Sequence, residues 1–250
     1  GRIASVELKN FKTYDQKPLI MFEGEGNKFG LIFGSAGQNI NTNELYFVPS
    51  IRSLSVAKSD SSSLTMRLTH SEGKYIDYIY TLKGESYNVG LTISTTGMQN
   101  VVAPTQQYLT LNWEAVLKQK EKYLPSEQQY STAYFKMGDA SVDHLEKLKS
   151  EKKDLTEGKI KWVSFKQHFF SNILIAKNSF DKGEIAVNTS PDTGIVKTFA
   201  ASMQVPFGRQ DVTSYPMEFY FGPNQLNILE KQGFDIEKQV DLGYWPLTYI

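Results

Sequence analysis

Apolar and polar residues alternate with a period of two along most of the chain, which predicts β-strands rather than helices. Between Ser63 and Thr69, for example, Leu64, Met66 and Leu68 alternate with polar neighbours,. The predicted strands are residues 3–9, 18–22, 29–33, 44–48, 63–69, 75–82, 87–94, 109–113, 128–137, 184–189, 195–205 and 215–221. Because turn-rich segments separate these runs and no strand–helix alternation is present, the pattern favours an all-β, antiparallel sandwich and excludes a Rossmann or barrel-type α/β fold.

The densest run of β-branched and aromatic residues spans Lys159–Phe180 and contains neither glycine nor proline,. Its alternation places Trp162 on one side of a strand and Phe165 on the other, so both sides are expected to be buried. We expect the chain to fold back at Ser171 and Asn172 into a second strand. The sequence therefore predicts a central structural hairpin here.

Two segments depart from this pattern and predict helices. Glu114–Tyr123 consists of good helix formers and is followed by Pro125, which indicates a short helix,. A C-terminal helix is expected at about 223–232, because Pro223 would open it and Gly233 would end it,. Leu226 and Leu229 would dock its apolar side on the sheet.

Residues 138–158 are rich in charged side chains of both signs. Mixed charges of this kind normally face water, so we expect a solvated connection with a helical turn at residues 144–149.

Composition narrows the function classes further. The 250 residues include 27 basic and 27 acidic side chains and no cysteine. A net charge of zero argues against nucleic-acid binding, and the missing cysteines exclude disulfides, a thiolate nucleophile and cysteine-based metal sites. No apolar run approaches the ~20 residues of a membrane helix. The chain begins without methionine, so we expect a fragment, residues 1–250, that forms one domain.

The candidate chemistry is sparse. His168 lies in the hydrophobic stretch without a nearby carboxylate, and a general base needs a partner within hydrogen-bond reach,. His70 and His144 each lie beside an acidic residue in a predicted loop, as ordinary surface pairs do. Nucleophile-elbow, P-loop and metal-helix motifs are absent,. The sequence therefore predicts no catalytic, cofactor-binding or metal-binding residue.

Residues 240–250 are apolar and aromatic, where a soluble domain usually ends in polar residues,. Two interpretations remain open for this end. It forms an edge strand that completes the sandwich, or it is a membrane-proximal junction, because tyrosine and tryptophan collect at membrane interfaces.

Several short motifs occur along the chain in a characteristic order. They are Arg2–Lys9, Tyr14-Asp15, Pro18-Leu19, Leu111-Asn112-Trp113, Lys161–Phe170 with Leu174-Ile175, Phe221-Gly222-Pro223 and Val240–Trp245. Together they resemble the large periplasmic domain of YidC-type membrane protein insertases of Gram-negative bacteria, most closely the Bacteroidetes type. The resemblance marks these structural motif residues: Trp162, Phe165, Gln167, Phe169, Phe170, Gly222, Pro223, Asp241 and Gly243.

The resemblance implies a β-supersandwich similar to galactose mutarotase, with a short C-terminal helix, at the periplasmic face of the bacterial inner membrane. It implies a non-enzymatic module that docks or positions partners, namely accessory subunits of the Sec translocon and nascent membrane proteins. Insertion itself is assigned in that family to a transmembrane core outside these residues. No cofactor is implied.

A carbohydrate-binding or carbohydrate-active sandwich protein is the alternative from another class. The aromatic-rich β architecture and the mutarotase-like fold motivate it, although fold alone is weak support for function. The sequence lacks an evident pair of histidine and glutamate to carry such chemistry.

Overall fold

The computed structural model describes residues 1–241, and in this part of the chain all strand pairings are antiparallel. A nine-stranded sheet has the order β11 (Asp143–His144), β10 (Thr132–Met137), β13 (Ile160–Lys166), β14 (Phe170–Phe180), β17 (Val212–Pro223), β8 (Asn88–Thr96), β7 (Lys74–Lys83), β6 (Ser61–Ser71) and β5 (Val48–Pro49). A six-stranded sheet has the order β12 (Glu151–Leu155), β15 (Gly183–Thr189), β16 (Ile195–Pro206), β9 (Tyr108–Lys118), β3 (Lys28–Ser35) and β4 (Gln38–Asn41). The hairpin of β1 (Ser5–Lys12) and β2 (Pro18–Glu23) forms a separate small sheet.

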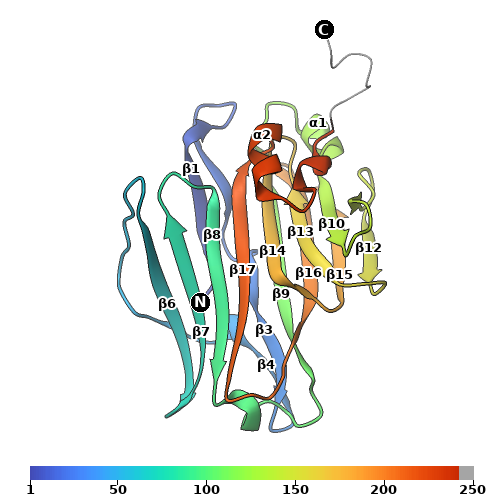
Figure 1. Ribbon diagram of the computed structural model, residues 1–250. Coiled ribbons are helices and arrows are strands. Elements are labelled where there is room, and N and C mark those ends of the chain that lie inside the picture. The colour runs from blue at the N-terminus through green and yellow to red at the C-terminus, as the bar shows by residue number, and fades with distance from the viewer. Residues whose placement is uncertain (242–250) are drawn as a thin grey trace.

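Helical structure is confined to short pieces. The α-helices are α1 (Leu124–Gln129) and α2 (Leu226–Leu229), and the 3₁₀ turns are η1 (Thr42–Glu44), η2 (Met98–Asn100), η3 (Glu230–Gln232) and η4 (Ile236–Gln239). Figure 1 shows α1, α2 and the β1–β2 turn at the same end of the sandwich. No helix among residues 1–241 is long and apolar enough to cross a membrane.

The main core lies between the two large sheets. Phe165 of β13 stacks on Trp113 of β9 at 4.0 Å between ring centroids and on Phe199 of β16 at 5.1 Å. These contacts join the nine-stranded sheet to the six-stranded one, and the three rings are 0–5% exposed. The predicted antiparallel supersandwich with a short C-terminal helix is therefore confirmed.

The helix predicted over Glu114–Tyr123 is wrong. Residues as far as Lys118 continue β9, where Ala115 pairs with Phe199 and Leu117 with Lys197 of β16. Helix-forming residues take the strand conformation here because the pairing buries Ala115 and Leu117 in the core,. The helix begins only at Leu124, and Pro125 lies in its first turn, where proline needs no hydrogen-bond donor,.

The charged connection over residues 138–158 is also partly wrong. Glu151–Leu155 forms β12, which pairs with β15 and buries Leu155, and the expected helical turn at 144–149 is replaced by β11 followed by bends. Charge alone therefore does not exclude an edge strand whose other face meets water.

Other element boundaries also differ from the sequence predictions. The strand expected at 44–48 is reduced to Val48–Pro49, and the strand expected at 128–137 begins at Thr132 because α1 takes up its first residues. The predicted C-terminal helix begins at Leu226 rather than Pro223, since Gly222 and Pro223 still pair with β14. Its predicted end at Gly233 is confirmed, with φ of 74° there.

Candidate functional site

Five of the nine motif residues meet at the end of the β13–β14 hairpin. The turn lies at Gln167–Phe169, four residues before the expected position, and Gln167 N–H donates to the Phe170 carbonyl at 2.8 Å. Phe170 pairs with Pro223, and Ser171 pairs with Gly222. The strand alternation therefore stops at Lys166, and His168 and Phe169 belong to the turn.

Asn224 fixes this turn from the neighbouring strand. Its side-chain amide donates to the carbonyls of Gln167 (2.9 Å) and His168 (3.1 Å), and its backbone N–H donates to the Phe169 carbonyl (2.7 Å). Gly222 is required nearby, because a Cβ there would come within 2.6 Å of the Tyr220 hydroxyl. The hairpin turn is thus held rigidly against the end of β17.

The buried side chain of Gln167 links two groups of opposite charge. Its side-chain oxygen accepts from Lys120 Nζ at 2.7 Å, and its amide donates to Glu127 Oε1 at 2.8 Å. Glu127 also accepts from the backbone N–H groups of Lys120 and Glu121 at 3.0–3.2 Å. Burial lowers the pKa of Lys120 to about 8 and raises the pKa of Glu127. This buried network ties α1 to the hairpin turn.

The outer face of β13 is covered by residues 226–240, which we call the C-terminal segment. Trp162 is fully buried beneath it with Leu229 and Ile236, and its Nε1–H donates to the Phe234 carbonyl at 2.9 Å. Ser164 donates to Gln239 Oε1 at 2.7 Å. Both faces of β13 are therefore buried, as the sequence predicted, but the outer face is buried by the end of the chain.

A bend of three residues lets the C-terminal segment fit over Trp162. Gly233, Phe234 and Asp235 all have left-handed backbone angles, with φ between 55° and 74°. Such angles are costly for phenylalanine and aspartate. The Trp162 bond and the 2.5 Å ion pair between Lys136 and Asp235 stabilise the bend, and this pairing lowers the pKa of Asp235 to about 2.

Two further buried lysines hold the segment that follows α1. Lys166 Nζ donates to the Tyr130 carbonyl at 3.0 Å, and Lys197 Nζ donates to the Ser131 and Lys147 carbonyls at 2.5 and 2.6 Å. Burial lowers the pKa of both lysines to about 8. The ammonium groups thus satisfy carbonyls at a helix C-terminus, where cations are favourable.

These lysines predict that stability increases with pH. Between about pH 8 and 10.5 the unfolded chain keeps a proton that each folded lysine has lost, so the free energy of unfolding rises, by at most about 1.4 kcal/mol per pH unit and lysine. Denaturant titrations from about pH 8 to 10 measure this slope. Lys197→Met should reduce the slope, whereas the exposed Lys122→Met should not. A flat profile for the parent would contradict the burial of charged lysines.

The three histidines lie in three different environments. His168 stacks between Tyr130 and Phe169, with ring centroids at 4.6 and 3.9 Å. Burial and Lys166 lower its pKa. His144 contacts the Leu145 carbonyl at 2.7 Å, and His70 is exposed on β6. Among residues 1–241 no group of three histidine or acidic side chains could hold a metal ion.

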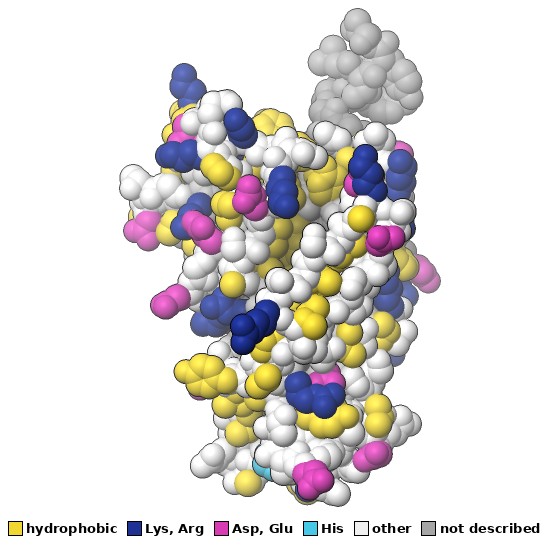
Figure 2. All heavy atoms as spheres, turned by 90° about the vertical axis from the view of Figure 1, so that its left-hand side faces the viewer, with side chains coloured by type: hydrophobic (Ala, Val, Ile, Leu, Met, Phe, Trp, Pro, Cys, Tyr) yellow, Lys and Arg dark blue, Asp and Glu magenta, His cyan; other side chains and the backbone are white. Residues whose placement is uncertain are grey.

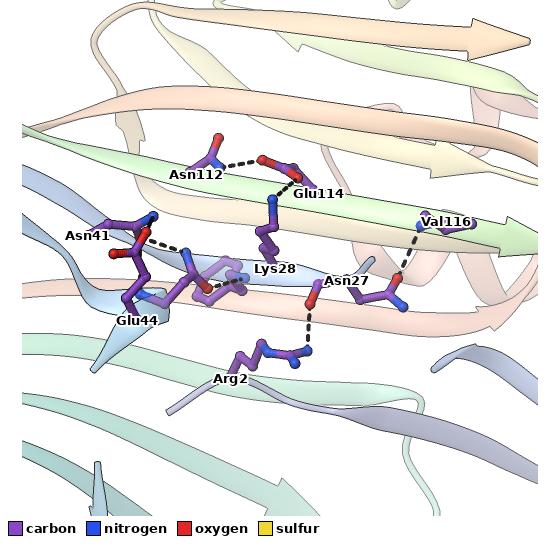
Figure 3. Close-up of polar contacts among 10 residues, drawn as sticks. Arg2, Asn27, Lys28, Asn41, Glu44, Asn112, Glu114 and Val116 are labelled. Carbon is purple, nitrogen blue, oxygen red and sulfur yellow. Dashed lines mark hydrogen bonds and ion pairs between the residues drawn. The ribbon is translucent and has the colours of Figure 1, made fainter. Parts of the chain in front are cut away.

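The outer face of β3 and β9 carries a polar cluster (Figure 3). Glu114 accepts from Lys28 Nζ at 2.9 Å and from Asn112 at 2.8 Å. The buried Asn27 joins the N-terminal residues to β9, because its carbonyl accepts from Arg2 and its side-chain oxygen accepts from Val116 N–H. The Glu114 carboxylate is thus engaged in contacts that hold the strands together.

The side of the molecule around β5 and β6 shows interspersed basic and acidic side chains with apolar ones between them (Figure 2). The apolar residues include Tyr46, 94% exposed, and Val48, 68% exposed. No single-sign charged surface is visible on this face, in agreement with the net charge of zero,.

Of the two remaining motif residues, only Asp241 belongs to the described chain, as its last residue. Asp241 is exposed and forms a 3.5 Å ion pair with Lys147. Gly243, and most of the membrane-proximal end expected at 240–250, lie outside the described residues. Sequence reasoning missed Lys120, Glu127 and Asn224, which complete the site.

Comparison with known proteins agrees with this geometry. The chain matches the family model for the YidC periplasmic domain over residues 1–250. Proteins named membrane protein insertase YidC from Parabacteroides distasonis and Phocaeicola vulgatus are 34% and 32% identical to it. These matches cover 99–100% of this chain but only 40% of each relative.

A solved structure shares the fold. The α-N-acetylgalactosaminidase NagBb from Bifidobacterium bifidum, in a GalNAc complex, superimposes with a TM-score of 0.53 and 8% identity, covering 87% of this chain and 34% of that one. At this identity the likeness concerns the fold alone. With the family model and the insertase relatives matching from end to end, the chain belongs to the YidC periplasmic domain family.

Proposed function

We propose that this chain positions partner proteins beside a membrane protein insertase and catalyses no covalent reaction. Family membership supports a periplasmic location associated with the inner membrane. Because the chain spans 40% of the curated relatives' length, insertion itself is assigned here to the whole insertase and assistance to this chain. The proposed partners are accessory subunits of the Sec translocon and nascent membrane proteins.

The packing of the C-terminal segment on β13, which we call the seat, is the observation that supports the proposal. A flexible tether would let the sandwich point in any direction. Trp162, Ser164 and Lys136 instead fix residues 234–239 in one orientation on the sheet. A sandwich held in this way can present the same face to a partner at all times.

The alternative of carbohydrate chemistry has less support. Glycoside hydrolysis uses two carboxylates that flank the scissile bond, whereas the Glu114 carboxylate is paired with Lys28. His168 has aromatic neighbours rather than an acidic partner. A fold shared with a glycosidase does not by itself identify a ligand for this chain.

Site-specific photocrosslinking in native membranes tests the proposal. A photoreactive residue is placed in the full-length insertase at Tyr46, Lys152 or Phe169, which lie just before β5, on β12 and in the β13–β14 turn. We expect crosslinks to a Sec accessory subunit or a nascent chain from one of these faces. The absence of such neighbours at all three positions would contradict the docking role.

A variant with a loosened seat provides the control. Trp162→Phe keeps an aromatic ring but removes the Nε1–H bond to Phe234. If positioning depends on the seat, crosslinks should spread over several faces in this variant. An unchanged pattern would show that the seat does not orient the sandwich.

A further inference from the structure

One end of the sandwich gathers exposed aromatic side chains from segments far apart in sequence. We call it the aromatic end and define it by Tyr14, Tyr123, Tyr130, Phe169 and Leu226, which are 53%, 67%, 37%, 50% and 37% exposed. They come from the β1–β2 turn, the two ends of α1, the β13–β14 turn and the start of α2. Figure 1 places the β1–β2 turn, α1 and α2 at this same end.

Hydrogen bonds and ring contacts join the segments that carry these residues. Tyr14 N–H donates to the Lys120 carbonyl at 3.0 Å, which joins the β1–β2 turn to the segment before α1. Tyr130 stacks on His168, which stacks on Phe169. Asn224, two residues before Leu226, binds the Phe169 carbonyl. The aromatic end is therefore built by tertiary contacts.

Buried polar contacts hold the segments that carry the exposed rings. The buried Lys120–Gln167–Glu127 network and Asn224 hold α1 and the β13–β14 turn in place, so Phe169 is kept at the surface. Clustered exposed apolar side chains mark an interaction site. Rings ordered in advance also lose little conformational entropy when they are buried.

The chemistry of this end fits lipid better than an acidic or basic partner. Three of its five defining residues are tyrosines, whose apolar body and polar hydroxyl suit a half-wet interface. Lys17, the lysine of the β1–β2 turn, is paired with Asp15 at 2.6 Å, and Lys122 lies beside Glu121. Both lysines thus have an acidic neighbour, so we do not expect attraction by anionic headgroups to drive binding.

The aromatic end lies at the same end of the molecule as the C-terminal segment. The C-terminal segment begins with α2, which lies at this end of the molecule (Figure 1). The relatives that match this chain are named membrane protein insertases. We propose that the aromatic end rests on the headgroup interface of the lipid bilayer, inserting Tyr123 and Phe169 and holding the sandwich upright on the membrane.

This inference rests on the proposed function only for the presence of a nearby membrane, because it concerns lipid and not a protein partner. Vesicle co-flotation of the chain, with no other protein present, tests it. We expect binding both to pure phosphatidylcholine vesicles and to 3:1 phosphatidylethanolamine and phosphatidylglycerol vesicles. Raising salt from about 0.1 to 0.5 M should change it little, because added salt weakens attraction between exposed charges and leaves burial of apolar rings almost unaffected.

Variants locate the contact. Tyr123→Ser with Phe169→Ser should weaken vesicle partitioning by at least about tenfold, since two large apolar side chains are no longer buried. Tyr46→Ser, at the 94% exposed aromatic residue of the β5 side, should leave it unchanged. Equal losses in both variants, or no flotation of the parent chain, would overturn the proposal.

A second measurement does not depend on those variants. The chain has no cysteine, so Gln129→Cys on α1 and Tyr46→Cys can each carry one environment-sensitive dye. Vesicles should shift the emission to the blue at position 129 and not at position 46. A shift at 129 that appears without vesicles as protein concentration rises would assign the surface to a second copy of the chain instead. If the vesicle tests fail but crosslinks to Sec subunits are still seen, the lipid contact is wrong and the proposed positioning function is unaffected.

Discussion

Replacing Trp162 by alanine is expected to lower the free energy of unfolding by about 3–5 kcal/mol, the cost typical of a buried large aromatic side chain. The side chain is fully buried, packs against Leu229 and Ile236, and donates to the Phe234 carbonyl. Its removal leaves a cavity and frees the left-handed bend at residues 233–235. Chemical denaturation with thermal melting measures the loss, and at about 2–4 °C per kcal/mol the Tm should fall by roughly 10 °C.

Phe169→Ala is the matched control for this prediction. Phe169 lies seven residues further along the same hairpin but is 50% exposed. Its truncation should change stability by less than about 1 kcal/mol, as is usual for surface positions. A Trp162→Ala protein that kept its melting temperature while losing partner crosslinks would show that Trp162 is a binding residue rather than a structural one.

Removing the charge of Glu127 is expected to cost about 3–5 kcal/mol, the range seen when a buried charge is left without compensation. Glu127 is 1% exposed, accepts from two backbone N–H groups, and is linked through Gln167 to Lys120, which is 2% exposed. Glu127→Gln leaves the Lys120 ammonium buried without a counter-charge. Denaturant unfolding measures the difference, and Glu121→Gln at the half-buried neighbour provides the control.

A double-mutant cycle separates the charge effect from lost packing. Lys120→Met combined with Glu127→Gln removes both charges and should cost less than the sum of the single changes, with a coupling energy of at least about 1 kcal/mol. Strictly additive costs would mean that Lys120 and Glu127 do not interact.

The sequence predicted the architecture well where burial follows local alternation. β6, β7 and β8 form where alternation predicted strands at 63–69, 75–82 and 87–94, and they pair in chain order as antiparallel neighbours. The Lys159–Phe180 hairpin was identified as central, and both faces of β13 are buried. Its turn was misplaced because Asn224, which fixes Gln167–Phe169, lies more than 50 residues away in sequence.

The candidate site was only partly visible in the sequence. Trp162, Phe165, Gln167, Phe170 and Gly222 are all buried, with Trp162 and Phe165 on opposite faces of β13, whereas Phe169 is exposed and Gly243 falls outside the described residues. Their membership of a family motif stays a prediction. For Lys166 and Lys197 the sequence does contain a signal, because each lysine stands at a strand position whose face should be buried. A lysine at such a position indicates a buried charge that needs hydrogen-bond partners. Lys120 and Glu127 gave no such signal, since they lie in a charged stretch that normally faces water.

The sequence by itself determined the class of this protein and its family, because a period of two is a local property of each strand and the motif order runs along the chain. Only the tertiary structure decided how far β9 extends, since its helix-forming residues follow the pairing with β16 rather than their own propensity,. It also decided which charges are buried and which aromatic rings remain exposed at the end of the sandwich. Those outcomes depend on contacts between distant segments, whose energies outweigh local preferences and leave no periodic signal in the sequence.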